Sequence, residues 1–127
     1  MGVGGNAMKT ILFVDDEKYL RMLYEREFAQ DGYRVLTADS GADALGVLRR
    51  EPVDIAVVDI RMPGMSGLEL MDEMLAARRD LPVILNTAFS SYKDNFQSWL
   101  AEAYVVKSSD LSELKNKVAD VLARPPI

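Results

Sequence analysis

A short apolar run near the middle of the chain, Ile-Ala-Val-Val at residues 55–58, is closed by Asp59 and followed within a few residues by Pro63, Gly64 and Gly67. A run of this length bounded by turn residues is typical of a strand buried on both faces, as the strands of parallel sheets are. Such a strand has no structural need for a carboxylate, and ligands of open parallel sheets bind beyond the carboxyl ends of the strands. We therefore hypothesise that Asp59 carries the chemistry and that the other elements position it.

Four further runs, at residues 9–14, 33–38, 82–87 and 103–106, also predict strands, and the third strand extends over 55–59. Helical patterns fill the intervals: one from residues 15–17 to Gly32, then 40–52, 66–79, 90–100 and 110–122. Within the weakly helical 90–100 segment, Phe96, Trp99 and Leu100 form the apolar face, and Ser66 to Glu69 is a capping-box pattern. This alternation predicts an α/β fold in which helices cover both faces of a parallel sheet.

Length and composition narrow the class of protein. The 127 residues suit one domain, here residues 9–123, with a flexible leader or cloning remnant over 1–8 and a tail or linker start over 124–127. The absence of cysteine fits a cytoplasmic protein, and no apolar run is long enough to cross a membrane. The net charge of −5, with scattered Lys and Arg, argues against nucleic acid as a direct ligand. Without histidine, any catalysis must use carboxylates, Lys, Ser, Thr or Tyr.

Reactive side chains stand at the carboxyl ends of the predicted strands: Asp15 and Asp16 after the first, Asp59 after the third, then Thr87 and Lys107. If the first and third strands are neighbours, roughly 4.8 Å apart, three carboxylates converge, and like charges so close need a cation. Oxygen ligands favour a hard ion, with Mg²⁺ first among them. The lysine and the hydroxyl could hold a phosphoryl group opposite the metal. The set indicates phosphoryl transfer with aspartate as the acceptor.

Each of these residues also has a simpler interpretation. An acidic pair such as Asp15 and Asp16 often caps the following helix. Thr87 alone is an ordinary β-branched strand residue with a satisfied hydroxyl, and Lys107 alone is a solvated charge. Asp59 has the weakest alternative, because an Asx-type turn explains it only in part. Their joint placement at one end of one sheet favours the functional interpretation.

Four motifs follow one another in a specific order: Phe13-Val14-Asp15-Asp16-Glu17, Val58-Asp59-Ile60-Arg61-Met62-Pro63-Gly64-Met65-Ser66-Gly67, Thr87-Ala88, and Tyr104 with Lys107. In this order and spacing they resemble the receiver (phosphoacceptor) domain of the two-component response-regulator family. The resemblance extends from Lys9 to about Leu122, nearly the whole chain. It implies a doubly wound, flavodoxin-like fold with five parallel strands in the order 2-1-3-4-5.

The resemblance also implies roles at the acidic end. Asp59 would be phosphorylated by a phosphohistidine of a sensor histidine kinase or of a histidine phosphotransfer protein. Asp16 would bind Mg²⁺ directly and Asp15 mostly through water, with Asp59 and the backbone carbonyl of Arg61 as further ligands. The domain would be a signalling phosphoacceptor and not an enzyme, beyond self-catalysed phosphorylation and dephosphorylation.

On the opposite side of the phosphoryl group, Lys107 and Thr87 would hold its oxygens. Inward movement of Thr87, followed by Tyr104, would be the conformational switch. The face formed by the fourth helix, the fifth strand and the last helix would report the change to an output protein or domain whose identity the sequence does not give. Arg61 and Phe89 stand where side chains could screen the acyl phosphate from water.

Two departures from the family pattern are visible. Ser108 follows Lys107, where receiver domains usually have a proline after a cis peptide bond. A cis bond before a non-proline residue costs about 2.5–4 kcal/mol, so the loop must be strained or take another path. The interval from Thr87 to Lys107 is 20 residues, a couple fewer than usual, and Glu102 replaces a common glycine. We therefore predict a short, shifted or poorly ordered fourth helix.

Two alternative functions compete with this interpretation. A phosphatase of the haloacid dehalogenase type would need a second acid two residues after its nucleophile, and that position is Arg61. A binding module that works without phosphorylation on the same fold would typically lack one acid or the lysine, and none is missing here. The altered loop after Lys107 keeps this second alternative open, because a fold does not guarantee a function.

Overall fold

The computed structural model describes residues 8–92 and 100–124. Its elements follow one another as β1 (Thr10–Val14), α1 (Lys18–Gln30), β2 (Arg34–Ala38), α2 (Gly41–Arg50), β3 (Ile55–Val58), α3 (Gly67–Ala77), β4 (Val83–Thr87), a 3₁₀ turn η1 (Ser90–Tyr92), β5 (Ala103–Val106) and α4 (Ser112–Ala123). All five predicted strands are present, and their ends agree with the predicted ends to within one residue. The predicted leader and tail lie almost wholly outside the described residues.

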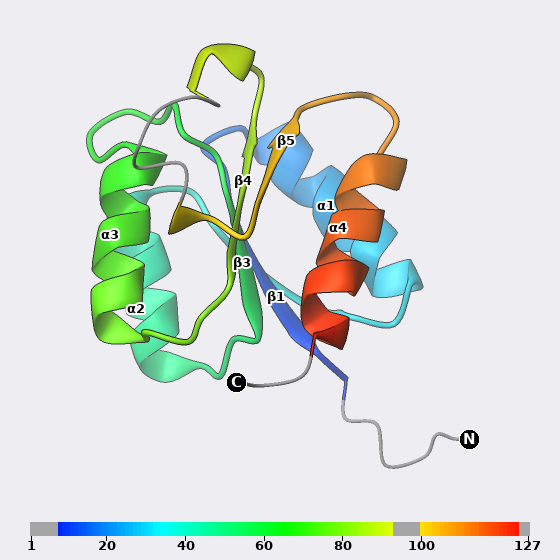
Figure 1. The fold of residues 1–127 in the computed structure, drawn as a ribbon, viewed down its shortest axis with the longest axis horizontal. Helices are drawn as coiled ribbons and strands as arrows, with labels where there is room; N and C mark the ends of the chain where they lie inside the picture. Colours follow the sequence, from blue (N-terminus) through cyan, green and yellow to red (C-terminus); the bar gives the residue numbers. More distant parts are fainter. Residues whose placement is uncertain (1–7, 93–99, 125–127) are drawn as a thin grey trace.

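The five strands form one parallel sheet in the order β2-β1-β3-β4-β5. Figure 1 shows α2 and α3 on one face of this sheet and α1 and α4 on the other. The fold class and the strand order implied by the resemblance are therefore confirmed. Within residues 8–92 and 100–124, no helix is both long and apolar enough to span a membrane.

Two hydrophobic clusters, one on each face of the sheet, make up the core. In β3, Ala56 and Val58 join the cluster formed with α2 and α3, whereas Ile55 and Val57 join the cluster formed with α1 and α4. Both sets are buried because successive side chains of a strand point to opposite faces and both faces are covered. This explains why the run is apolar without interruption.

A side-chain cap is observed at α2 and at α3 but not at α4, whose N-cap is Leu111. The Ser66 hydroxyl accepts from the backbone N–H of Glu69, whose carboxylate accepts in return from the Ser66 N–H, so the capping box at α3 is confirmed. Gly32 follows the end of α1 with a φ of +96°. Residues other than glycine rarely adopt this backbone conformation. The helix expected from residue 110 begins at Ser112, and Asp110 accepts from its N–H at 2.9 Å.

The segment between β4 and β5 is only partly described. Ser90–Tyr92 form a 3₁₀ turn, and residues 93–99, including Phe96 and Trp99 of the predicted apolar face, lie outside the described residues. The helix predicted between β4 and β5, the fourth along the sequence and distinct from α4, was expected to be short, shifted or poorly ordered, and this stays a prediction. In the described part of the chain no peptide bond is cis. Of the two alternatives expected for the loop after Lys107, a strained cis bond or a different path, the loop therefore takes the different path.

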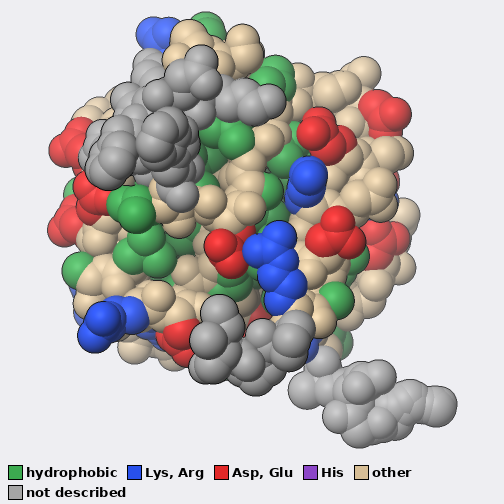
Figure 2. All heavy atoms as spheres, viewed as in Figure 1, with side chains coloured by type: hydrophobic (Ala, Val, Ile, Leu, Met, Phe, Trp, Pro, Cys, Tyr) green, Lys and Arg blue, Asp and Glu red, His purple; other side chains and the backbone are tan. Residues whose placement is uncertain are grey.

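The face of the molecule in Figure 2 carries charges of both signs. Lys and Arg side chains stand singly or in small groups among Asp and Glu side chains on this face. The scattering of basic residues along the sequence is thus also seen in space on this side of the molecule.

Candidate functional site

The hydrogen-bond ladder of the sheet brings Asp15 and Asp59 side by side. Val14 and Val58 are register partners in β1 and β3, and each aspartate is the next residue. The Asp59 N–H continues the ladder by donating to the Val14 carbonyl at 3.0 Å. Both carboxylates point to the α1/α4 face, because Phe13 and Val57, two residues earlier, belong to the cluster on that face.

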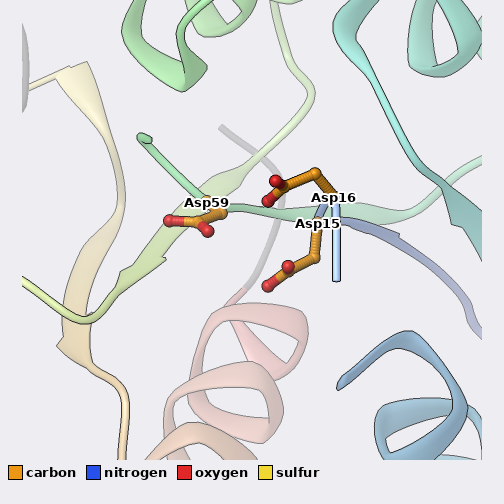
Figure 3. Close-up of side chains that lie close together, drawn as sticks. All are labelled: Asp15, Asp16 and Asp59. Atoms are coloured by element: carbon orange, nitrogen blue, oxygen red, sulfur yellow. The ribbon is translucent and has the colours of Figure 1, made fainter. Parts of the chain in front are cut away.

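The acidic cluster consists of Asp15, Asp16 and Asp59. One carboxylate oxygen of each residue lies within 4.8 Å of those of the other two, and Figure 3 shows the three side chains gathered in one place. Asp15 and Asp59 are only 2% and 6% exposed, whereas Asp16 is exposed. The predicted convergence of three carboxylates is therefore observed, with two of them nearly removed from water.

Lys107 bridges the two buried carboxylates. Its Nζ lies 2.7 Å from Oδ2 of Asp15 and 3.0 Å from Oδ2 of Asp59. Burial alone would lower the pKa of the Lys107 ammonium, but hydrogen bonds and attraction from the two carboxylates outweigh it, and this pKa is raised. Burial raises the pKa of Asp15, although Lys107 and the Glu17 N–H act against that shift. The ammonium is thus held charged by the two carboxylates.

The donor set fits a hard divalent cation. The formal charges of three carboxylates and one ammonium sum to −2 at the cluster. All the acidic ligand atoms are oxygens, which Mg²⁺ prefers, and Asp16 leaves one side open to water. The prediction that the backbone carbonyl of Arg61 is a further ligand stays a prediction. The Arg61 N–H donates to Oδ1 of Asp59 over a long 3.4 Å.

The simpler interpretation of Asp15 as a cap of the following helix is wrong, because Glu17 is the N-cap of α1 and no side chain caps that helix. Oδ1 accepts from the Glu17 N–H at 2.9 Å, a local turn at the start of α1, while Oδ2 binds Lys107. The Arg21 guanidinium donates to the Asp15 carbonyl at 2.8 Å and fixes the backbone there. Asp15 therefore serves both the entry to the helix and the acidic cluster.

Thr87 ends β4 with a fully buried side chain. Its hydroxyl has no hydrogen-bond partner among the described residues, so none of them provides the satisfied hydroxyl of the simpler interpretation. A buried hydroxyl without a partner is unfavourable by about 1–3 kcal/mol. The Thr87 carbonyl accepts from the Lys107 N–H at 2.7 Å, which ties this strand end to the lysine. The hydroxyl is therefore a spare donor at the end of β4, and no hydrogen bond among the described residues joins it to the acidic cluster.

Phe89 contacts two further predicted residues, Tyr104 and Arg61. The Tyr104 hydroxyl donates to the Phe89 carbonyl. The Arg61 guanidinium stands 4.5 Å from the centroid of the Phe89 ring, a cation–π geometry. The loops after β3 and β4 and the strand β5 are thus joined through Phe89. Screening of the site by Arg61 and Phe89 stays a prediction.

Gly67 is a site residue that the sequence analysis did not single out beyond its turn chemistry. Its N–H donates to the Ile60 carbonyl at 2.8 Å, and a Cβ at this position would lie 2.0 Å from the Asp59 carbonyl oxygen. The first residue of α3 therefore packs directly against the backbone of Asp59. Only the absence of a side chain permits this approach.

We expect Gly67→Ala to destabilise the protein by about 2–3 kcal/mol, because an added methyl group must displace backbone atoms and not a flexible side chain. Urea unfolding measures the effect. Gly46→Ala in α2 is the matched control, since its Cβ would meet only the far ends of the flexible Arg50 and Arg49 side chains. That change is expected to stabilise by up to about 1 kcal/mol, through helix propensity. Equal stability of Gly67→Ala and the parent would contradict the close approach.

Comparison with known proteins identifies the family. The family model of the response regulator receiver domain matches residues 11–119. The crystal structure of the response regulator TrrA from Thermotoga maritima, in complex with Mg²⁺-BeF, superposes with a TM-score of 0.87 and 43% identity, covering 90% of this chain and 99% of that one. TrrA in its crystal complex with the histidine kinase ThkA superposes with a TM-score of 0.85, covering 92% and 100%.

Among curated proteins, the "Probable transcriptional regulator ycf27" of Pyropia yezoensis is 36% identical over 121 residues, which are 94% of this chain and 49% of that protein. The transcriptional regulatory protein GlrR of Escherichia coli K12 is 42% identical over 84 residues, 66% of this chain and 19% of that protein. The chain thus spans about half, or less, of the length of these relatives. With its fold, its acidic cluster and this match, the chain belongs to the family of response regulator receiver domains.

Proposed function

We propose that Asp59 of this receiver domain accepts a phosphoryl group from the phosphohistidine of a sensor histidine kinase or a histidine phosphotransfer protein. The observation that carries the proposal is the bridge of Lys107 to Asp15 and Asp59 in nearly buried surroundings, with Asp16 beside them. The crystal complex of TrrA with the histidine kinase ThkA supports a kinase as the partner. Receiver domains are signalling phosphoacceptors, which removes the phosphatase alternative.

In this proposal Asp15, Asp16 and Asp59, with the Arg61 carbonyl, hold Mg²⁺. The residual charge of the cluster and its oxygen ligands support that assignment, as does the complex of TrrA with Mg²⁺-BeF. When bound, the metal supplies positive charge against the oxygens of the transferred phosphoryl group. The protein's own side chains supply the rest of the site.

The transfer itself uses Asp59 as the nucleophile. A lone pair of one carboxylate oxygen forms the new O–P bond, while the N–P bond of the phosphohistidine breaks and its electron pair stays on the imidazole nitrogen. Lys107 already lies 3.0 Å from Asp59, so its ammonium can follow the charge onto the phosphoryl oxygens with little reorganisation. Burial of the carboxylate strengthens this attraction by excluding water.

The conformational switch starts from Thr87. Its buried hydroxyl lacks a partner in the described part of the chain and gains one when phosphoryl oxygens are present, which favours the conformation that brings it inward. Tyr104 bonds to the Phe89 carbonyl two residues after Thr87, so a displacement of that segment reaches Tyr104. A shift of this kind would inform an output protein or a further domain.

The proposal also places the domain, over residues 9–123, in the cytoplasm. The absence of cysteine throughout the sequence suits a reducing compartment. Residues 1–8 would be a flexible leader or a cloning remnant, and residues 124–127 a tail or the start of a linker.

The test is incubation of the purified protein with Mg²⁺ and acetyl phosphate, followed by intact mass spectrometry. We expect a gain of one phosphoryl group that EDTA prevents, because the acidic cluster cannot take up a further anion while its charge is uncompensated. Absence of any gain with Mg²⁺ would reject the proposal and favour the binding module that works without phosphorylation.

A further inference from the structure

Asn86 lies in the same layer of the sheet as the acidic residues. Val58 and Leu85 are register partners in β3 and β4, so Asp59 and Asn86 are each the next residue along neighbouring strands. Ile84, two residues before Asn86, belongs to the cluster on the α1/α4 face. The side chain of Asn86 therefore points to the same face as Asp59.

On that face, Asn86 meets Tyr24 of α1. The Nδ2 atom of Asn86 lies 3.0 Å from the hydroxyl oxygen of Tyr24, in a buried hydrogen bond between residues 62 positions apart. Both side chains are 3% exposed. The Tyr24 ring also stacks on Phe13 in β1, with 4.9 Å between centroids and 18° between planes. Tyr24 thus reaches across β1 to the end of β4, near the acidic cluster.

A polar pair in this position needs an explanation. Tyr24 belongs to the hydrophobic cluster on this face, and a buried polar group is unfavourable unless it is hydrogen-bonded. Two apolar side chains could fill the same space without that requirement. A buried hydrogen bond, unlike an apolar contact, fixes one relative placement of the elements it joins.

The charges of the site also act on Tyr24. Burial raises the pKa of the Tyr24 phenol; the bond to Asn86 and the charge of Lys107 lower it, while Asp15 and Asp59 raise it further. The phenol is therefore subject to the charges of the three residues that surround the phosphoacceptor. It keeps its proton at neutral pH and can both accept from Asn86 and donate.

We propose that Tyr24 and Asn86 are positioning residues of the phosphoacceptor site, whose hydrogen bond fixes the end of β4 against α1 beside Asp59. Thr87 follows Asn86 directly, and its carbonyl accepts from the Lys107 N–H at 2.7 Å. A shift of this strand end would therefore move both groups that hold phosphoryl oxygens. The inference rests on the proposed function of Asp59.

The test compares Tyr24→Phe, Asn86→Leu and the double variant. The measured quantities are the rate of phosphorylation by acetyl phosphate at saturating Mg²⁺, followed by intact mass, and the midpoint of urea unfolding. Each single variant is expected to phosphorylate about fivefold more slowly, the effect of one neutral hydrogen bond. The double variant loses the same bond and is expected to be equally slow, not about 25-fold slower. Its stability should exceed that of Asn86→Leu, because no polar partner is left unpaired.

Tyr33→Phe is the matched control. Tyr33 packs against the same hydrophobic cluster, next to Phe28, but precedes β2 at the opposite end of the sheet. Its rate should equal that of the parent. Parent-like rates in Tyr24→Phe, or recovery of rate together with stability in the double variant, would show a purely structural role and overturn the inference alone. Absence of phosphorylation in the parent would overturn the proposed function and this inference together.

Discussion

Replacing Asp59 with asparagine is expected to abolish phosphorylation by acetyl phosphate, with no gain of mass in the presence of Mg²⁺. The amide is a far weaker nucleophile than the carboxylate and carries no charge for the metal. The change is nearly isosteric and leaves an oxygen that can accept from Lys107, which lies 3.0 Å away in the parent. A loss of uptake would therefore report chemistry and not unfolding, which circular dichroism of the variant checks.

Asp54→Asn is the matched control for this experiment. Asp54 precedes the same strand at its opposite end and accepts from the Thr10 N–H at 2.7 Å, a bond that the asparagine oxygen can keep. This variant should gain one phosphoryl group at the parent rate. A full gain of mass in Asp59→Asn would instead identify a different acceptor, with Asp15 and Asp16 the first to examine.

Replacing Lys107 with methionine is expected to destabilise the metal-free protein by about 3 kcal/mol, in the range for a buried ion pair that loses one partner. The side chains of Asp15 and Asp59 are only 3% and 7% exposed, so their charges would be left without compensation. Added Mg²⁺ should stabilise this variant more than the parent, because the cluster is more negative by one charge. Urea unfolding in EDTA and in Mg²⁺ measures both effects.

Lys115→Met provides the comparison. Lys115 also bridges two carboxylates, those of Glu27 and Asp31, at 3.3 Å and 3.1 Å, but all three side chains are more than a quarter exposed. Exposed ion pairs contribute about 0–1 kcal/mol, so this change should have little effect. If Lys107→Met proved as stable as the parent in EDTA, the bridge would not compensate the buried acids.

Most of the fold could be predicted because its signals are local. The length of each apolar run, the glycine after α1 and the serine caps of α2 and α3 depend on neighbours a few residues away. Alternation of strands and helices then favours a parallel sheet. The order of the strands is not a local property, and the family resemblance, not the residue pattern, supplied it.

The candidate site was likewise predictable from the sequence only in part. Placement of Asp15, Asp59 and Lys107 at strand ends followed from the sequence, since the ends of parallel strands meet at one edge of the sheet. That Lys107 bridges two carboxylates did not follow, because it depends on the side-chain directions of three strands at once. That the Thr87 hydroxyl has no partner among the described residues likewise did not follow from the sequence, because the simpler interpretation was a satisfied hydroxyl.

The amino-acid order thus specified which segments become strands and which side chains stand at their ends, because backbone preference and hydrophobic period act over a few residues. The folded arrangement settled the contacts between distant segments: Gly67 against the Asp59 backbone, and Tyr24 with Asn86 across 62 positions. These contacts arise where a helix packs on a particular layer of the sheet. Nothing in either segment alone carries that information, since the distance between them is set by the whole core.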